Sequence, residues 1–373
     1  MTLLSVVLIF FLIYGSLFFY YKKGWCSLSE FSTQGTNKCS FISVIVPARN
    51  EESHIGELLI ALKQQSYPQC NFEIIVVDDF SDDSTAHIVK SFKLPNLLLL
   101  QPGVQADASS KKKAIETAVR TAKGELIVTT DADCIPPVDW LQTINGFYVQ
   151  KEASFIVAPV KFSHNKSLLQ AFQAIDFITL QGITAASVAT NFHTMCNGAN
   201  LAYKKQSFID VNGFEGIEHV ATGDDMLLMY KIWKENPGKV FYLKSKQAIV
   251  KTEPMLTWKD FYMQRKRWAS KTLVYHDFRI IAVLAFVYLF NCLFFILILF
   301  SFSNSEYWLY VIGYLFLKTA IEWNFVSAVA HFYKEQKLMS YFFLFQPLHI
   351  LYTVVVGSIS QFGKYEWKGR RTK

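Results

Sequence analysis

Between residues 41 and 133 the chain alternates short apolar runs with segments of helical periodicity, and this pattern limits the possible folds most strongly. Four apolar runs, rich in β-branched residues or leucine, are expected to be strands: residues 41–46, 72–77, 96–100 and 125–130. The intervening segments are expected to be helices: residues 55–65, 85–92 and 111–123. Strands that alternate with helices predict an α/β domain with a buried parallel sheet.

Two of the expected strands lead directly into pairs of aspartates. Asp78 and Asp79 follow the second strand, and Asp131 and Asp133 follow the fourth. Ligands of open α/β sheets bind beyond the carboxyl ends of strands, so these carboxylates are expected at a binding site. Asp131 and Asp133 can share a hard divalent cation and leave positions for phosphate oxygens, although a solvated turn is the alternative. Asp79 can accept a hydrogen bond from a base or ribose, and capping of the next helix is the competing explanation.

Three later features add polar candidates. Lys111 begins a helix after a serine-rich stretch and can reach a phosphate, but it lies in a run of three lysines, so a solvated side chain is the alternative. Asn197–Asn200 is a turn of small polar residues that forms either a pocket floor or an ordinary turn. Asp224 and Asp225 begin a helix, where a carboxylate can act as general base on an acceptor hydroxyl or simply oppose the helix dipole.

Residues 257–279 have the pattern of an amphipathic helix in a lipid headgroup region. Phe261, Arg265 and Trp268 lie near one face, and basic residues occupy the rest. Arg267 can bind a diphosphate through its planar guanidinium, and Trp268 can stack on a sugar ring or an acceptor. A membrane-surface helix with no chemistry is the alternative.

Apolar segments predict an attachment to the membrane. Hydrophobic residues make up 51% of the 373 residues, a composition unusual for a soluble enzyme of this size. Residues 3–21 are uncharged and long enough to cross a bilayer, and they lack the preceding positive charges and cleavage site of a signal peptide. Lys22 and Lys23 follow, which by the positive-inside rule places the next domain in the cytoplasm.

Three more apolar segments are expected near the C-terminus: residues 280–302, 307–333 and 341–362. Lys318 and Glu322 are four residues apart and can neutralise each other against a neighbouring helix. Three crossings would place the basic tail outside, against the positive-inside rule. The last segment, which contains Pro347, is therefore the candidate for a re-entrant or interfacial helix.

Charge and cysteine usage favour the same location. The net charge is +7, and the basic residues gather beside the apolar segments, which favours an anionic membrane face. No nucleic-acid-binding motif accompanies them, so a nucleic-acid partner is not expected. The six cysteines lack CxxC spacing, which indicates free thiols and a catalytic part facing the cytosol.

Five motifs together, in this order, resemble a known family. They are SVIVPARNEE, VVDDFSDDST, KKKAIETAVRTAKGELIVTTDADC, GDD and QRKRW, and they strongly resemble membrane-bound processive and lipid-linked members of glycosyltransferase family 2. The similarity covers residues 41–268 and the flanking apolar segments. It implies a GT-A fold, a Rossmann-like nucleotide-sugar-binding α/β domain, with N-terminal and C-terminal transmembrane helices. The expected organisation is a transmembrane anchor at 1–24, a catalytic domain at 40–255, an interfacial segment at 256–279, a transmembrane region at 280–363 and a basic tail at 364–373.

The resemblance also implies roles for individual residues. Asp225 resembles the general base, Asp224 its acidic neighbour, and Asp131 and Asp133 the metal-binding pair, with Asp133 the main ligand. Residues that would bind the donor nucleotide or its diphosphate are Pro47, Asp78, Asp79, Lys111, Asp131, Gln264 and Arg267, and Trp268 would border the acceptor. Ser110 replaces the glycine of the family's GKxxAL stretch, which leaves the role of Lys111 open.

The implied activity is inverting transfer of a sugar from a UDP- or GDP-sugar to a lipid or glycan acceptor, with Mg or Mn as divalent cation. The expected location is a multi-pass membrane protein with its catalytic domain on the cytoplasmic face, the inner membrane in a bacterium. A processive polysaccharide synthase is an alternative, although four apolar segments are few for a secretion channel. A non-catalytic nucleotide-sugar-binding membrane protein is the other alternative. The sequence does not specify the donor sugar.

Overall fold

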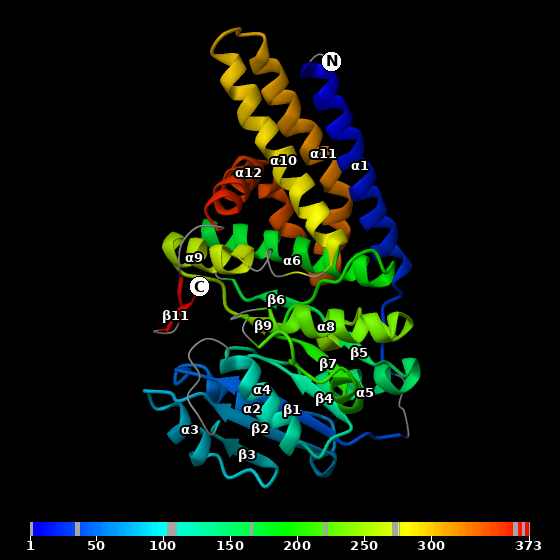
Figure 1. Ribbon diagram of the computed structural model, residues 1–373, viewed down its shortest axis with the longest axis vertical. Helices are drawn as coiled ribbons and strands as arrows, with labels where there is room; N and C mark the ends of the chain where they lie inside the picture. The colour runs from blue at the N-terminus through cyan, green and yellow to red at the C-terminus, as the bar shows by residue number, and fades with distance from the viewer. Residues whose placement is uncertain are drawn as a thin grey trace. The chain divides into compact units, whose positions relative to one another are not determined.

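The computed structural model describes residues 3–33, 38–102, 110–164, 167–218, 220, 223–270, 275, 277–360, 365–367 and 370–372. The chain divides into two compact units. The sheet unit comprises Ser29–Ser163, Thr194–Glu253 and Lys364–Lys373. The helical unit comprises Met1–Leu28, His164–His193 and Pro254–Gly363. Figure 1 labels the main helices and strands of both units.

The sheet unit is built on seven strands in the order β3-β2-β1-β4-β7-β5-β8 (Figure 1). The strands are β1 (Ile42–Ala48), β2 (Phe72–Asp78), β3 (Leu97–Leu100), β4 (Leu126–Thr129), β5 (Phe155–Val157), β7 (Leu201–Lys204) and β8 (Val240–Tyr242). The first four are parallel, as predicted, whereas β7 runs antiparallel to both β4 and β5. The predicted α/β class is therefore confirmed, and the sheet is mixed beyond β4.

Strands β1 and β4 form the buried centre of the sheet. Val44, Ile45 and Val128 are completely buried, and each buried side chain of this kind stabilises the fold by about 1.5–3 kcal/mol. β1 runs two residues further than expected and includes Pro47 near its end. Proline has no backbone N–H to donate to a neighbouring strand. Gly124 allows the chain to enter β4, because a Cβ there would lie 2.5 Å from the Ser43 nitrogen.

Helices on the sheet unit position its loops. They are α2 (Ile55–Lys63), α3 (Thr85–Ser91), α4 (Ser110–Thr121), α5 (Trp140–Lys151), α7 (Lys205–Asp210) and α8 (Asp224–Glu235), with 3-10 turns η1 (Gln69–Asn71), η2 (Pro237–Lys239) and η3 (Lys246–Ala248). The predicted helices α2, α3 and α4 are confirmed. Ala114 and Ala118 are fully buried where α4 packs on β1 and β2 (Figure 1). Because these alanine side chains are small, α4 packs closely on β1 and β2, and its first turn lies near the ends of these strands.

Two small sheets complete this unit. β6 (Val160–Phe162) pairs in parallel with β9 (Val250–Thr252). β10 (Tyr365–Trp367) pairs antiparallel with β11 (Arg370–Thr372) within the basic tail. Lys364, Lys368 and Lys373 of that tail lie outside the described residues.

The helical unit contains α1 (Leu3–Ser27), α6 (Leu168–Ala189), α9 (Trp258–Ala269), α10 (Phe278–Ser301), α11 (Tyr307–Tyr333), the 3-10 turn η5 (Gln336–Tyr341) and α12 (Phe342–Ile359). Helix α6 packs against α1 and α11. Two glycines permit this close approach. A Cβ at Gly24 would lie 2.8 Å from the Ala186 carbonyl oxygen, and a Cβ at Gly182 would lie 2.4 Å from Val329 Cγ2.

Three helices among the described residues are long and apolar enough to cross a membrane: Leu3–Ser27, Phe278–Ser301 and Gln336–Ile359. The fourth predicted segment, α11, carries Lys318 and Glu322, which form a buried ion pair as expected. Gln346 of α12 contacts both partners, at 2.7 Å from Lys318 and 2.6 Å from Glu322, and the Tyr14 hydroxyl of α1 donates to Glu322. The charges of α11 are therefore satisfied within the helical unit.

Candidate active site

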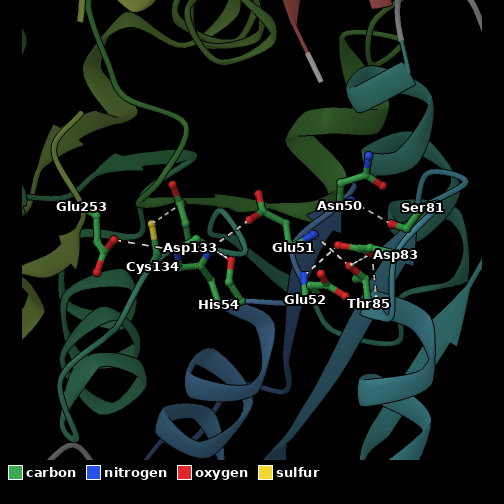
Figure 2. A network of polar contacts seen from close by, with 11 residues as sticks. Asn50, Glu51, Glu52, His54, Ser81, Asp83, Thr85, Asp133, Cys134 and Glu253 are labelled. Atoms are coloured by element: carbon green, nitrogen blue, oxygen red, sulfur yellow. Dashed lines mark hydrogen bonds and ion pairs between the residues drawn. The ribbon is translucent and has the colours of Figure 1, made fainter. Parts of the chain in front are cut away.

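Two loops at the carboxyl ends of β1 and β2 are joined by hydrogen bonds between their backbones and side chains (Figure 2). The Asn50 N–H donates to Ser81 Oγ at 2.9 Å, and the Glu51 N–H donates to Thr85 Oγ1 at 2.8 Å. Arg49 spans the same gap, donating to the Asp79 carbonyl oxygen at 2.6 Å. The motifs PARNEE and DDFSDDST thus form one hydrogen-bonded rim at the strand ends.

The rim explains the first acidic pair. Asp78 is buried, and its Oδ1 accepts from the Ser81 N–H at 3.3 Å while its Oδ2 accepts from Gln101 at 3.0 Å. Asp79 is also buried, and its N–H donates to the Ala48 carbonyl oxygen at 2.8 Å. At the start of helix α3 the carboxylate of Asp83 accepts from the Thr85 N–H at 2.9 Å.

A pocket of the sheet unit collects residues from separate segments of the chain. The residues that carry polar chemistry or shape this pocket are Pro47 in β1, Lys111 on α4, Asp131 after β4, Gly198 before β7, Tyr203 in β7, and Asp224 and Asp225 on α8. The strand order brings the ends of β1, β4 and β7 together, so residues far apart in the sequence share one cavity. Asp78, Asp79 and Asp133 are not among the residues that line it.

Lys111 lies between carboxylates of this pocket. Its Nζ donates to Asp131 Oδ1 at 2.7 Å and lies 3.8 Å from Asp224 Oδ2. Burial by itself lowers the pKa of Lys111, but the nearby carboxylates of Asp131, Asp224 and Asp225 outweigh it and raise the pKa overall. The ammonium therefore stays charged. The side chain is partly exposed and forms ion pairs with carboxylates of the pocket.

Asp225 is held by backbone amides on both oxygens. Its Oδ2 accepts from the Gly198 N–H at 3.0 Å, and its Oδ1 accepts from the Met226 N–H at 2.8 Å. Gly223 begins the helix with a positive φ of 81°, a conformation that glycine adopts without strain. The backbone of the Asn197–Asn200 turn thus orients the Asp225 carboxylate, and the turn forms part of the pocket wall.

Comparison with known proteins identifies the domain. Residues 43–211 match the family model described as Glycosyl transferase family 2. The chain carries a family 2 glycosyltransferase domain. The matched residues contain β1 to β4, the rim and Asp131, Asp133 and Lys111, whereas Asp224 and Asp225 follow the match.

Relatives and a solved structure agree with this assignment. The chain is 27% identical over 197 residues to glycosyltransferase AglE of Haloferax volcanii, covering 51% of this chain and 60% of AglE. It is 38% identical over 101 residues to a dolichyl-phosphate beta-glucosyltransferase, ALG5D, of Trichomonas vaginalis, covering 25% of this chain and 30% of that protein. The chain therefore spans less than two thirds of these relatives. The mannosyltransferase PcManGT of Pyrobaculum calidifontis, solved with GDP-Man and Mn²⁺, has a similar fold, with a TM-score of 0.59, 16% identity, and coverage of 96% of this chain and 99% of that one.

The family 2 domain offers oxygen ligands for a divalent cation. Among the described residues no three His, Cys, Asp or Glu side chains are grouped to hold a metal ion. Asp131 and Asp133 stand one residue apart after β4, and Asp133 Oδ1 accepts from the Cys134 thiol at 3.6 Å (Figure 2). Mg²⁺ is usually bound by one or two carboxylates together with waters and substrate phosphates. These carboxylates therefore fit a cation that binds with a diphosphate.

Tyr203 of the family 2 domain is a pocket residue that the sequence analysis did not select. It is 1% exposed, and its hydroxyl has no hydrogen-bond partner among the described residues. Burial, and then the Asp224 carboxylate, raise the pKa of Tyr203, so the hydroxyl keeps its proton. Its ring stacks on Phe155 and Phe208. A tyrosine within the apolar strand that follows the Asn197–Asn200 turn was the available signal.

The QRKRW motif lies on α9, in the helical unit. Its buried arginine is Arg265, not Arg267, and Arg265 pairs with Asp176 of α6 at 2.7 Å. The guanidinium lies 4.4 Å from the centre of the Trp268 ring. The position of Arg265 on the aromatic face of the predicted helix was the signal for its burial.

Proposed function

We propose that the chain is a membrane-bound inverting glycosyltransferase, which transfers a sugar from a nucleotide-diphosphate sugar to a lipid or membrane-proximal acceptor with Mg or Mn. The observation that carries this proposal is the shared pocket of Lys111, Asp131, Asp224 and Asp225 at the strand ends of a family 2 domain. A cation, a diphosphate and a general base are the three requirements of such a transfer, and this pocket supplies residues for each.

The proposed reaction is a single displacement. Asp225 accepts the proton of an acceptor hydroxyl, whose oxygen attacks the anomeric carbon from the face opposite the leaving group. The bond to the nucleoside diphosphate breaks, and the configuration inverts. When bound, the divalent ion offsets the negative charge that develops on the leaving diphosphate. Lys111 contributes a second positive charge at the same end of the pocket.

We assign the remaining predicted residues as follows. Asp131 and Asp133 are the cation ligands, and Asp224 keeps a second negative charge beside the base. Asp78, Asp79 and Pro47 shape the nucleotide subsite, which their positions at the carboxyl ends of β1 and β2 support. Gln264 and Arg267 remain candidates for diphosphate binding, and Trp268 for acceptor binding.

Membrane attachment and a lipid acceptor have separate support. Three helices have the length and apolar character of membrane spans. ALG5D, whose name gives dolichyl phosphate as its acceptor, is similar over a quarter of this chain. We propose that the family 2 domain works at the cytoplasmic face.

The proposal is tested on the purified full chain in lipid nanodiscs. Thermal shifts with a panel of UDP- and GDP-sugars, with and without Mn²⁺, identify a donor, and transfer to membrane lipid extracts is then measured. A metal-dependent shift followed by addition of one sugar is the expected result. A polymeric product would indicate a processive synthase, and donor binding without transfer or hydrolysis would indicate a non-catalytic protein.

A further inference from the structure

The three consecutive lysines at the start of α4 have three different environments. Lys111 lies among the pocket carboxylates. Lys112 is 3% exposed and donates to the carbonyl oxygens of Ile217 and Val220 at 2.5 and 2.7 Å. Lys113 is exposed to solvent. The position of Lys111 is therefore specific.

The surroundings of Lys111 are shaped for a cation. Its Nζ contacts the carboxylates of Asp131 and Asp224, and a Cβ at Gly198 would lie 3.4 Å from that Nζ and 3.6 Å from Asp225 Oδ2. Three carboxylates thus lie around one small region, and the Lys111 ammonium forms ion pairs with two of them, Asp131 and Asp224. Without a cation they would repel one another across a short distance.

We propose that Lys111 is an internal counter-ion, which holds the place of the divalent cation in the donor-free protein and moves onto the donor diphosphate when donor and cation bind. This inference rests on the proposed function and extends it. The Lys111 ammonium lies 2.7 Å from Asp131 Oδ1. A divalent ion bound to Asp131 would lie within a few ångströms of that ammonium, so the two positive charges would repel each other and compete for the same carboxylate.

The donor removes this competition. A diphosphate brings negative charge that accepts hydrogen bonds from the ammonium, while the carboxylate oxygens become available to the divalent ion. Cation and donor therefore each favour binding of the other, and the coupling is reciprocal. The protein would bind the cation weakly alone and tightly with the nucleotide, which prevents metal loading of an empty pocket.

The experiment measures Mn²⁺ binding directly, by the electron paramagnetic resonance of free Mn²⁺, on the full chain in nanodiscs. Wild type, Lys111→Met and Lys113→Met are compared without nucleotide and with saturating UDP or GDP. Lys113→Met is the matched control, because it makes the same change two residues away at an exposed position. Thermal unfolding verifies folding, and Lys111→Gln replaces Lys111→Met if the latter does not fold.

Without nucleotide, Lys111→Met should bind Mn²⁺ about tenfold more tightly than wild type, the equivalent of losing one competing charged hydrogen bond. With nucleotide this advantage should vanish or reverse, because the diphosphate has lost its ammonium partner. Equal or weaker Mn²⁺ binding by folded Lys111→Met without nucleotide would overturn the inference and leave the proposed function intact. Absence of Mn²⁺ and nucleotide binding in wild type would overturn both.

Discussion

Replacing Asp225 with asparagine keeps the size of the side chain but removes its charge and one of its two acceptor oxygens. Both carboxylate oxygens accept backbone N–H groups in the structure, from Gly198 at 3.0 Å and Met226 at 2.8 Å. An asparagine can accept only one of these, because its amide nitrogen then faces the other N–H. We therefore expect Asp225→Asn to lower both the rate of transfer and the stability of the fold.

The two effects differ in size. Loss of a general base lowers kcat by about 10²–10⁴-fold, which corresponds to about 2.7–5.4 kcal/mol of activation free energy. Loss of one hydrogen bond to a charged group that is only partly buried corresponds to about 1.5 kcal/mol of unfolding free energy. That loss lowers Tm by about 3–6 °C in a unit of this size. Most of the lost activity therefore cannot come from unfolding.

The assay combines three measurements on the same preparation: initial transfer rates at saturating donor, donor Kd by calorimetry, and Tm by thermal unfolding. Asp210→Asn is the control, because Asp210 is exposed and undergoes the same chemical change at the end of α7. Donor Kd should stay within about threefold of wild type, since the base contacts the acceptor and not the donor. An unchanged kcat, or a loss of donor affinity as large as the loss of rate, would refute the assignment.

Three further changes test the packing and the polar groups. Gly182→Ala places a methyl group 2.4 Å from Val329 Cγ2, so it should lower the unfolding free energy by about 1–3 kcal/mol; an unchanged Tm in nanodiscs would contradict the α6–α11 packing. Asp176→Asn leaves the buried Arg265 without its anionic partner and should lower the free energy of unfolding by about 3–5 kcal/mol. A Tm equal to that of wild type would mean that the ion pair is solvated. Tyr203→Phe removes a buried hydroxyl that has no partner among the described residues, so the Tm should be unchanged or higher. A lower Tm would show that the hydroxyl stabilises the fold.

The alternation of apolar strands and helical segments predicted the first half of the fold correctly. Runs such as FISVIV and FEIIVV are typical of strands buried on both faces of a parallel sheet, so β1 to β4 and the helices between them could be predicted from the residue pattern. The antiparallel β7 was not predicted, because a four-residue strand after a turn carries no periodic signal that sets its direction.

The candidate site followed from the sequence in part. Asp131, Asp224 and Asp225 were selected because carboxylates at strand ends and helix starts suit a ligand, and the fold brings them to one pocket. Tyr203 was missed, and Arg265 was placed on the correct face without a role, because its partner Asp176 is 89 residues earlier in the chain. Contacts over such separations depend on helix packing, which no local pattern records.

The sequence by itself therefore determined which segments become strands and helices and which ends carry negative charge, because those properties depend on neighbouring residues. Only the tertiary structure decided which of three adjacent lysines enters the pocket and which of two nearby arginines is buried. Their side chains are nearly identical in chemistry. What separates them is the direction in which each leaves its helix, and hence the carboxylate that it meets from a distant part of the chain.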